Sequence, residues 1–389
     1  MTPGARIAAS IEVLDAVLVG APAEKTLTNW GRNNRFAGSK DRAAIRDLVF
    51  QAIRCRRTSG AWPVAHSARA WAIGSLHAND EDPVEVFTGA GHAPEELTAD
   101  ETIRPELSEL DVWDLQDWTI QNLIEFYGDH QAWEIAQVLR HRAPISLRVN
   151  LQKASVELVQ SELALNGIET AINNVCDTAL TVQNNPRRVV LQDAFVKGWF
   201  EFQDAASQAV TAAIPAHGRI LDYCAGGGGK SLALAARTGG KIFSHDVNLG
   251  RMTDIPLRAT RGGHDVQVIP PKDLNPTEKF DTVICDLPCT GSGAWRRSPE
   301  GKWKLTESDL ERYVELQCEI LTKAVGHIGP GGTLALITCS IFKSENQMQR
   351  DFIIKTFPEL SILTEKQYLP SPSQDGLYLA VFQNNIKIY

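Results

Sequence analysis

The chain has 389 residues, of which 43% are hydrophobic and 22% are charged, and its formal net charge is −8. This length predicts two or three domains with sizeable cores, and the composition excludes wholesale disorder and a small disulfide-stapled scaffold. Acidic residues interrupt the first twenty positions, and no run of 18 apolar residues follows, so we expect a cytoplasmic protein without a membrane segment. The seven cysteines form no C-x-x-C pair, so we expect free thiols and no metal site.

The negative charge is concentrated in one segment. Residues 81–137 hold fifteen acidic residues and a single basic one, Arg104, whereas the rest of the chain carries a net charge of +6. The overall acidity therefore does not exclude an anionic partner elsewhere on the surface.

Residues 1–140 are predicted to form an all-helical domain, because their apolar residues recur with helical spacing. Helical faces are predicted near residues 7–18 and 43–53, and at least two further helices over 106–140. The cluster RCRR (54–57) at the end of the second face fits either pairing with the helix dipole or a binding patch.

Residues 141–202 change pattern and predict a small α+β subdomain. ISLRVN (145–150) and TALTVQ (178–183) are typical of strands, and 154–165 is typical of an amphipathic helix that ends at Asn166-Gly167.

Residues 203–389 alternate strand and helix patterns, which predicts a doubly wound, parallel, Rossmann-like α/β domain. Helices are expected from Lys230 and near 248–260, 306–327 and 344–357, and an antiparallel edge hairpin is expected to pair 360–364 with 377–383. The parallel strands are expected at RILDY (219–223), IFSHD (242–246), VQVI (266–269), TVICD (282–286) and TLALIT (333–338).

The loop after the first of these strands is rich in glycine and leads into a helix, which suits a nucleotide-like cofactor. Two interpretations compete. Gly229-Lys230-Ser231 matches the end of a phosphate-binding P-loop, but the first glycine of that motif would fall on Cys224. An S-adenosylmethionine site instead needs a carboxylate at the end of the next strand, where Asp246 stands either to bind a ribose or to cap the following helix.

Two cysteines follow two other strand ends. Cys289 comes shortly after Asp286, and Cys339 follows TLALIT, so parallel topology brings both thiols and the carboxylate to the cofactor crevice. This set is typical of C5 methylation of a pyrimidine, in which a thiolate adds to C6 and a second acid–base group assists removal of the C5 proton.

Four ordered motifs, GWFEFQDAASQ, LDYCAGGGGKS, DLPCTGSGAWRRSPE and TCSIFKSEN, resemble those of the Sun/Fmu-type (RsmB-like) RNA cytosine-C5 methyltransferase family. The resemblance covers about residues 143–389, and the helical N-terminal part resembles more weakly the NusB-like RNA-binding domain of bacterial members. It implies a class I methyltransferase domain that uses S-adenosyl-L-methionine and forms 5-methylcytosine in RNA.

The resemblance also implies residue roles. Cys339 of the T-C-S motif would be the nucleophile and Cys289 would assist product release, although DNA methyltransferases use the cysteine at the position of Cys289. Asp286 would contact the cytosine and Lys230 would lie near it. The cofactor would be bound by residues listed here in chain order: Cys224, Ala225, Gly226, Gly227, Gly228, Gly229, Lys230, Asp246, Arg251, Asp273 and Asp286.

The chain departs from the family at the four consecutive glycines, at Asp273, which is the only candidate for an adenine contact, and at Gln347, which replaces a glutamate of the E-N-E pattern. This last departure leaves Glu345 and Asn346 as possible structural residues at a helix start. Gln203, Asp204 and Ser207 match the QDxxS motif near the cytosine, and a helix cap is the alternative for Asp204.

RNA is the expected partner, with ribosomal RNA favoured over transfer RNA, and we expect a monomer. Predicted phosphate contacts and stacking residues are Arg148, Arg187, Arg188, Arg296, Arg297, Lys302, Lys304, Trp295 and Trp303. The alternatives are an RNA-binding assembly factor with an inactive methyltransferase fold and a P-loop nucleotide hydrolase.

Overall fold

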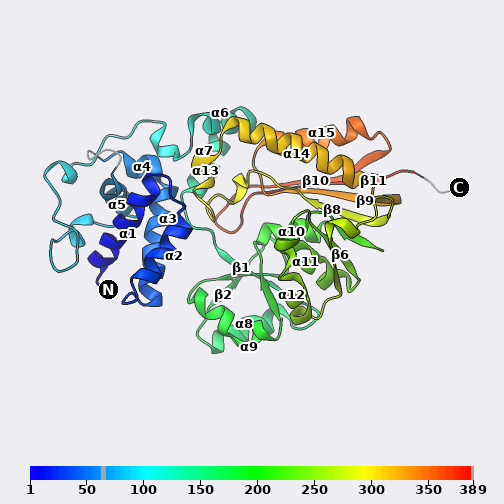
Figure 1. Ribbon diagram of the computed structural model, residues 1–389, viewed down its shortest axis with the longest axis horizontal. Coiled ribbons are helices and arrows are strands. Elements are labelled where there is room, and N and C mark those ends of the chain that lie inside the picture. The colour runs from blue at the N-terminus through cyan, green and yellow to red at the C-terminus, as the bar shows by residue number, and fades with distance from the viewer. Residues whose placement is uncertain (63–66, 387–389) are drawn as a thin grey trace. The chain divides into compact units, whose positions relative to one another are not determined.

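The computed structural model describes residues 1–62 and 67–386, in which helices and strands follow one another as traced in Figure 1. Contacts divide the chain into two units. The first unit contains residues 1–142 and 295–304, and the second contains residues 143–294 and 305–389. The predicted domain 203–389 contained residues 295–304, whereas the contacts group these residues with the first unit.

The first unit is helical in the part that is described, and the predicted apolar faces form its core around Leu14, Ile45 and Val49. Its first helix is capped by the side chain of Thr2, which accepts a hydrogen bond from the backbone of Ala5. The helices are α1 (Pro3–Leu18), α2 (Ala23–Asn33), α3 (Ser39–Arg54), α4 (Arg56–Gly60), α5 (Ala68–His77), α6 (Asp117–Tyr127), α7 (Asp129–Leu139) and α13 (Gly301–Lys304).

Residues 295–304 complete the end of α3. Lys302 Nζ donates to the carbonyl of Arg54 at 2.6 Å, and Trp303 Nε1 donates to the carbonyl of Ile53 at 2.7 Å. Carbonyls of the last helical turn lack partners within the helix, and a cation there also interacts favourably with the helix dipole. Burial lowers the pKa of Lys302 to about 8.

The predicted RNA contacts of Trp295, Arg296 and Lys302 are therefore wrong, because all three side chains are buried in the first unit. The RCRR cluster is also structural in this unit. Arg54 donates to the carbonyl of Arg296 at 2.9 Å, and Arg56 lies over the rings of Trp71 and Trp303.

Part of the acidic segment is neutralised within the same unit. Glu101 is buried and pairs with Arg69 at 2.7 Å, and the buried Asp114 pairs with Arg140 at 2.9 Å. These carboxylates hold the helices together, which is a structural role for acids whose function the sequence left open.

The second unit begins with a four-stranded antiparallel sheet in the order β2-β3-β1-β4. With one helix after β1 and another after β3, the βαββαβ arrangement is ferredoxin-like. The predicted strands and helix are confirmed, whereas the shortest elements were missed. The elements are β1 (Ile145–Val149), α8 (Val156–Leu165), β2 (Thr170–Ile172), β3 (Ala179–Val182), α9 (Asp193–Val196) and β4 (Phe200–Phe202).

The same unit continues with a seven-stranded sheet in the order β10-β11-β9-β8-β5-β6-β7, which confirms the Rossmann-like prediction. The five strands from β9 to β7 in this order are parallel. The strands are β5 (Ile220–Asp222), β6 (Ile242–His245), β7 (Val266–Ile269), β8 (Phe280–Asp286), β9 (Ile328–Thr338), β10 (Leu360–Tyr368) and β11 (Leu377–Asn384).

Helices accompany this sheet, and its last two strands form the predicted antiparallel pair. The pair is not an edge hairpin as a whole, because β11 also pairs with β9 and leaves only β10 at the edge. The almost wholly apolar stretch LYLAVF is buried in β11, as an interior strand requires. The helices are α10 (Ala205–Ala212), α11 (Gly229–Thr238), α12 (Ile255–Gly262), α14 (Glu307–Val325) and α15 (Gln347–Thr356).

Candidate active site

The candidate site lies at the carboxyl ends of β5, β8 and β9. β5 is bordered by β6 on one side and by β8 on the other, so the chain crosses to opposite sides of it. Ligands of open α/β sheets bind at such a switch point. The glycine-rich loop leaves β5 there, and the two cysteine loops leave β8 and β9.

The glycine-rich loop depends on two of its four glycines for its shape. Gly226 has φ +50° and Gly228 has φ +79°, in the left-handed region that favours glycine. A Cβ on Gly228 would lie 2.7 Å from Cγ1 of Ile255, and one on Gly226 would lie 2.8 Å from Nη2 of Arg251. The loop is therefore a cradle of bare backbone at the start of α11.

Asp246 anchors this loop from the end of β6. Its Oδ2 accepts a hydrogen bond from the backbone N–H of Gly226 at 2.9 Å, and its Oδ1 accepts one from Asn248 at 2.9 Å. Arg251 Nη1 lies 3.3 Å from Oδ2. The alternative of a cap for the next helix is wrong, because α12 begins only at Ile255. Ribose binding by Asp246 stays a prediction.

Asp222, the last residue of β5, is a site residue that sequence reasoning missed. It is buried, its Oδ2 accepts from Ser231 Oγ at 2.5 Å, and its Oδ1 has no hydrogen-bond partner among the described residues. Burial raises its pKa to about 7. An unpartnered buried oxygen beneath the glycine cradle suits a donor from a bound cofactor or a water molecule. Its position at the end of the first strand was the available signal.

Lys230 and Asp286 form an ion pair across the switch point, with 2.6 Å between Nζ and Oδ2. Lys230 is the second residue of α11 and Asp286 ends β8. Burial lowers the pKa of Lys230, but the charge and hydrogen bond of Asp286 outweigh this effect, so the pKa is raised overall. The pair therefore presents a fixed cation and a half-buried carboxylate to a ligand at this edge.

The two cysteines meet beside this pair. The Sγ atoms of Cys289 and Cys339 are 3.4 Å apart, and both side chains are partly exposed. The hydrogen bond with Cys339, followed by burial, raises the pKa of the Cys289 thiol well above its usual value. By contrast, Cys285 lies fully buried inside β8, which supports its interpretation as a core residue.

Glu345 joins the two cysteine loops, a role that the sequence did not reveal. Its carboxylate accepts hydrogen bonds from the backbone and hydroxyl of Thr290, at 2.9 and 2.6 Å, and from the hydroxyl of Ser340. Thr290 follows Cys289 and Ser340 follows Cys339, so one fully buried carboxylate ties both loops together. Asn346 adds a bond from its Nδ2 to the carbonyl of Ser340 at 2.9 Å.

The QDxxS motif lies beside the glycine-rich loop. Gln203 Nε2 donates to Ser207 Oγ at 3.1 Å and to the carbonyl of Gly229 at 3.2 Å. Asp204 is the N-cap of α10 and also accepts from the backbone of Asp375 at 3.2 Å. The helix-cap alternative for Asp204 is therefore confirmed.

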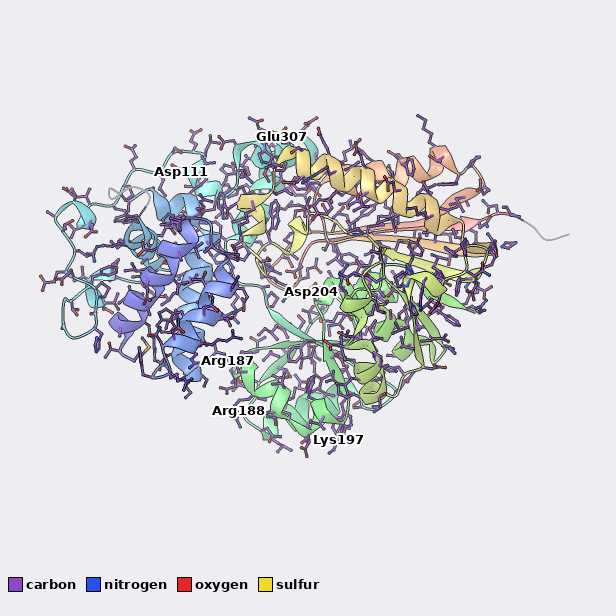
Figure 2. All side chains as sticks on the ribbon, viewed as in Figure 1. Asp111, Arg187, Arg188, Lys197, Asp204 and Glu307 are labelled. Atoms are coloured by element: carbon purple, nitrogen blue, oxygen red, sulfur yellow. The ribbon has the colours of Figure 1, made fainter. Side chains whose placement is uncertain are left out.

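The remaining predicted residues occupy different environments. Cys224 and Ala225 belong to the glycine-rich loop, where burial raises the pKa of Cys224. Asp273 is exposed in the turn Pro271–Asp273, and its contact with an adenine stays a prediction. Arg148 is buried in β1, so it is not the surface phosphate contact that was predicted. Figure 2 shows Arg187 and Arg188 at the outer surface of the small subdomain, where both are exposed.

Among residues 1–62 and 67–386, no group of three or more His, Cys, Asp or Glu side chains is arranged to hold a metal ion. None of the helices in the described part of the chain is long and apolar enough to cross a membrane.

Two family models match the chain, and one of the two matches begins within the first unit. Residues 209–383 match the model of 16S rRNA methyltransferase RsmB/F, and residues 116–189 match the ferredoxin-like domain of the RsmF/B-like methyltransferases. The sheet topologies described above agree with both matches.

Curated relatives include the ribosomal RNA small subunit methyltransferase B of Vibrio cholerae, which is 32% identical over 279 residues. The protein of the same name from Klebsiella pneumoniae strain 342 is 30% identical over 280 residues. Each alignment covers 68% of this chain, and the chain spans 64% of the length of each relative.

Solved structures show the same fold. The crystal structure of PH0851 has a TM-score of 0.76 at 23% identity and covers 98% of this chain and 99% of its own. NSun6 from Pyrococcus horikoshii has a TM-score of 0.62 at 16% identity and covers 70% of this chain and 99% of its own.

Proposed function

The chain carries a methyltransferase domain of the RsmB/F family, and we propose that it methylates C5 of a cytosine in RNA with S-adenosyl-L-methionine as the methyl donor. The observation that carries this proposal is the pair of thiols 3.4 Å apart beside the Lys230–Asp286 ion pair. These four groups come from α11, β8 and the loops that follow β8 and β9.

The cofactor fits the glycine cradle because the loop presents bare backbone, the carboxylate of Asp246 and the unpartnered oxygen of Asp222. When bound, S-adenosylmethionine supplies an electrophilic methyl group. We assign the rest of the loop, from Cys224 to Gly229, to the same binding site, with Arg251 at its rim and Asp273 at the adenine.

Cys339 acts as the nucleophile in this proposal. Its thiolate forms a bond to C6 of the cytosine, and the electron pair of the C5–C6 double bond is then available at C5. The T-C-S motif of the family assigns this role to Cys339 and the release of the product to Cys289, and the 3.4 Å between the two sulfur atoms leaves both within reach of one base.

Asp286 and Lys230 hold the cytosine ring through its polar edge. After the methyl group has reached C5, the proton of Cys289 passes to the departing sulfur of Cys339, and the Cys289 thiolate takes the C5 proton as the C6–sulfur bond breaks and the C5–C6 double bond returns. Its sulfur lies 3.4 Å from that of Cys339, close enough to serve the same base. The base must be single-stranded or flipped to reach these groups.

Small-subunit ribosomal RNA is the proposed substrate, in line with the names of the relatives, and transfer RNA is the alternative to be tested. Exposed Arg187 and Arg188 on the small subdomain support contact with a phosphate backbone. An inactive assembly factor is disfavoured because Cys339, Cys289 and the ion pair lie together in one place. A P-loop hydrolase is disfavoured because the hydroxyl of Ser231 is bonded to Asp222.

The test is methylation of unmodified 16S rRNA and of bulk transfer RNA with methyl-labelled cofactor, followed by bisulfite sequencing. We expect label in 16S rRNA at one or a few cytosines and none in transfer RNA. Label at a base other than cytosine, or no transfer to any RNA despite cofactor binding, would contradict the proposal.

A further inference from the structure

Two backbone carbonyls of the glycine-rich loop are held by arginines from outside the loop. Arg258 Nη1 donates to the carbonyl of Gly227 at 2.5 Å, and Arg148 Nη1 donates to the carbonyl of Gly229 at 3.0 Å. Arg258 belongs to α12, and Arg148 belongs to β1 of the small sheet. The loop therefore has two arginine supports in addition to Asp246.

Each arginine is itself oriented by a residue at the end of the small subdomain. Arg258 Nη2 and Nε donate to Oε2 of Glu201 in β4, at 3.1 and 3.3 Å. Arg148 Nη1 donates to Oε1 of Gln203 at 2.6 Å, and Gln203 Nε2 reaches the carbonyl of Gly229 at 3.2 Å. Both chains of contacts run from the ferredoxin-like subdomain to the glycine-rich loop.

We propose that Glu201 and Gln203 are positioning residues, which hold Arg258 and Arg148 against the loop so that the small subdomain sets the cofactor affinity of the methyltransferase domain. This inference rests on the proposed function, since it concerns the same cofactor site. It adds to the small subdomain a role in cofactor binding besides its expected contact with RNA.

The physical reason is preorganisation. A loop of four glycines loses more backbone entropy on ordering than any other four residues, and this loss weakens cofactor binding unless the loop is ordered beforehand. A guanidinium that is fixed by a carboxylate can donate to a carbonyl in a set direction, which a flexible lysine would not do. Arg258 and Arg148 meet this requirement because Glu201 and Gln203 orient them.

Arg261 provides a matched control. It also forms an ion pair with Glu201, and its guanidinium lies 4.0 Å from the centroid of the Phe195 ring. Within the described part of the chain, its side chain forms no hydrogen bond or ion pair with the glycine-rich loop. Arg261 therefore shares the Glu201 carboxylate with Arg258 but does not bind the carbonyl of Gly227. Loss of Arg261 removes a neighbouring cation from the same cluster and leaves the loop support in place.

The experiment measures S-adenosylmethionine affinity by titration calorimetry on the full chain without RNA. The variants are Arg258→Met, Glu201→Gln, the double variant, Gln203→Ala and Arg261→Met. We expect the dissociation constant to rise by roughly five- to twentyfold in the first two, and the double variant to match the single variants because both changes break one chain of contacts. Gln203→Ala should raise the dissociation constant by a similar factor. The dissociation constant of Arg261→Met should stay within about twofold of the value for the parent chain.

Methylation assays supply the second readout. In Arg258→Met and Glu201→Gln the KM for the cofactor should rise while kcat at saturating cofactor stays close to that of the parent chain, which a general loss of structure would not produce. Unchanged affinity in both Arg258→Met and Gln203→Ala, or additive effects in the double variant, would overturn the inference. Failure of the parent chain to bind the cofactor would instead overturn the proposed function.

Discussion

The sulfur atoms of Cys289 and Cys339 lie 3.4 Å apart although the two residues are 50 positions apart in the chain. Adjacent parallel strands bring them together, since β8 and β9 pair directly and each cysteine follows the end of its strand. We therefore expect the two thiols to act on the same base, and their roles can be separated by removing them one at a time.

Replacing Cys339 by Ala should abolish methyl transfer, because this variant lacks the thiol that we propose to add to C6 of the cytosine. Replacing Cys289 by Ala should leave the first transfer intact and slow release, so that a covalent protein–RNA adduct accumulates. Denaturing gels with labelled RNA detect the adduct, and filter binding of labelled methyl groups measures turnover. An adduct in Cys339→Ala instead of Cys289→Ala would reverse the assignment.

Replacing Glu345 by Gln should loosen both cysteine loops, because an amide has one acceptor oxygen where the carboxylate has two. We expect the free energy of unfolding to fall by about 1–3 kcal/mol and kcat to fall by roughly tenfold or more. Urea denaturation and single-turnover methylation measure these quantities. Glu307→Gln is the control, since Figure 2 shows this residue on α14 and its side chain is exposed. Equal losses of stability and kcat in both variants would contradict the role of Glu345 in linking the two cysteine loops.

Asp222 should make stability depend on pH. Burial raises its pKa from 3.8 to about 7, so its contribution to stability is present below pH 4 and is lost as the pH rises through about 7. Asp222→Asn cannot ionise and should be more stable than the parent chain at pH 8, by about 2–4 kcal/mol, with the difference shrinking below pH 4.

Thermal unfolding of the cofactor-free protein across this pH range measures the effect of Asp222→Asn. The exposed Asp254→Asn is the control and should follow the parent chain. A constant difference between Asp222→Asn and the parent chain at all pH values would show that the carboxylate does not titrate in this range.

Gly228 should tolerate substitution less than its neighbour Gly227. Alanine at 228 combines a left-handed backbone with a contact of 2.7 Å to Ile255, whereas a Cβ at 227 meets Nη1 of Arg258 at 3.8 Å. We expect Gly228→Ala to lower the free energy of unfolding by about 1–3 kcal/mol and Gly227→Ala by less than about 0.5 kcal/mol. Urea denaturation of both variants measures the difference, and equal losses would contradict it.

Sequence patterns predicted the parallel sheet and the proximity of Cys289, Cys339 and Asp286. Apolar strands followed by reactive side chains can be recognised locally, and parallel pairing places the ends of these strands at the same edge of the sheet. The short strands β2 and β4 were missed because three residues carry no clear alternation. Glu345 was recognised only as a possible helix-start residue, since its hydrogen bonds to Thr290 link it to a segment 55 positions away in the chain.

Burial was the property that side-chain chemistry could not predict. Lys302, Arg296 and Arg148 carry the positive charge expected of RNA contacts, yet all three side chains are buried. Lys302 and Arg148 donate hydrogen bonds to backbone carbonyls. A cation on a loop and a cation at the buried end of a helix look alike in a sequence. Arg187 and Arg188 are exposed, so their contact with RNA stays a prediction.

The contribution of residues 295–304 to the end of α3 means that the helical unit cannot be completed until late in translation. Although residues 1–142 leave the ribosome first, Lys302 and Trp303 follow only after the intervening 143–294 have been made, a delay on the order of ten seconds at typical synthesis rates. Until then the last carbonyls of α3 lack these two donors. The helical unit therefore lacks these two hydrogen bonds during synthesis of the second unit, and it gains them only after residues 295–304 have been made.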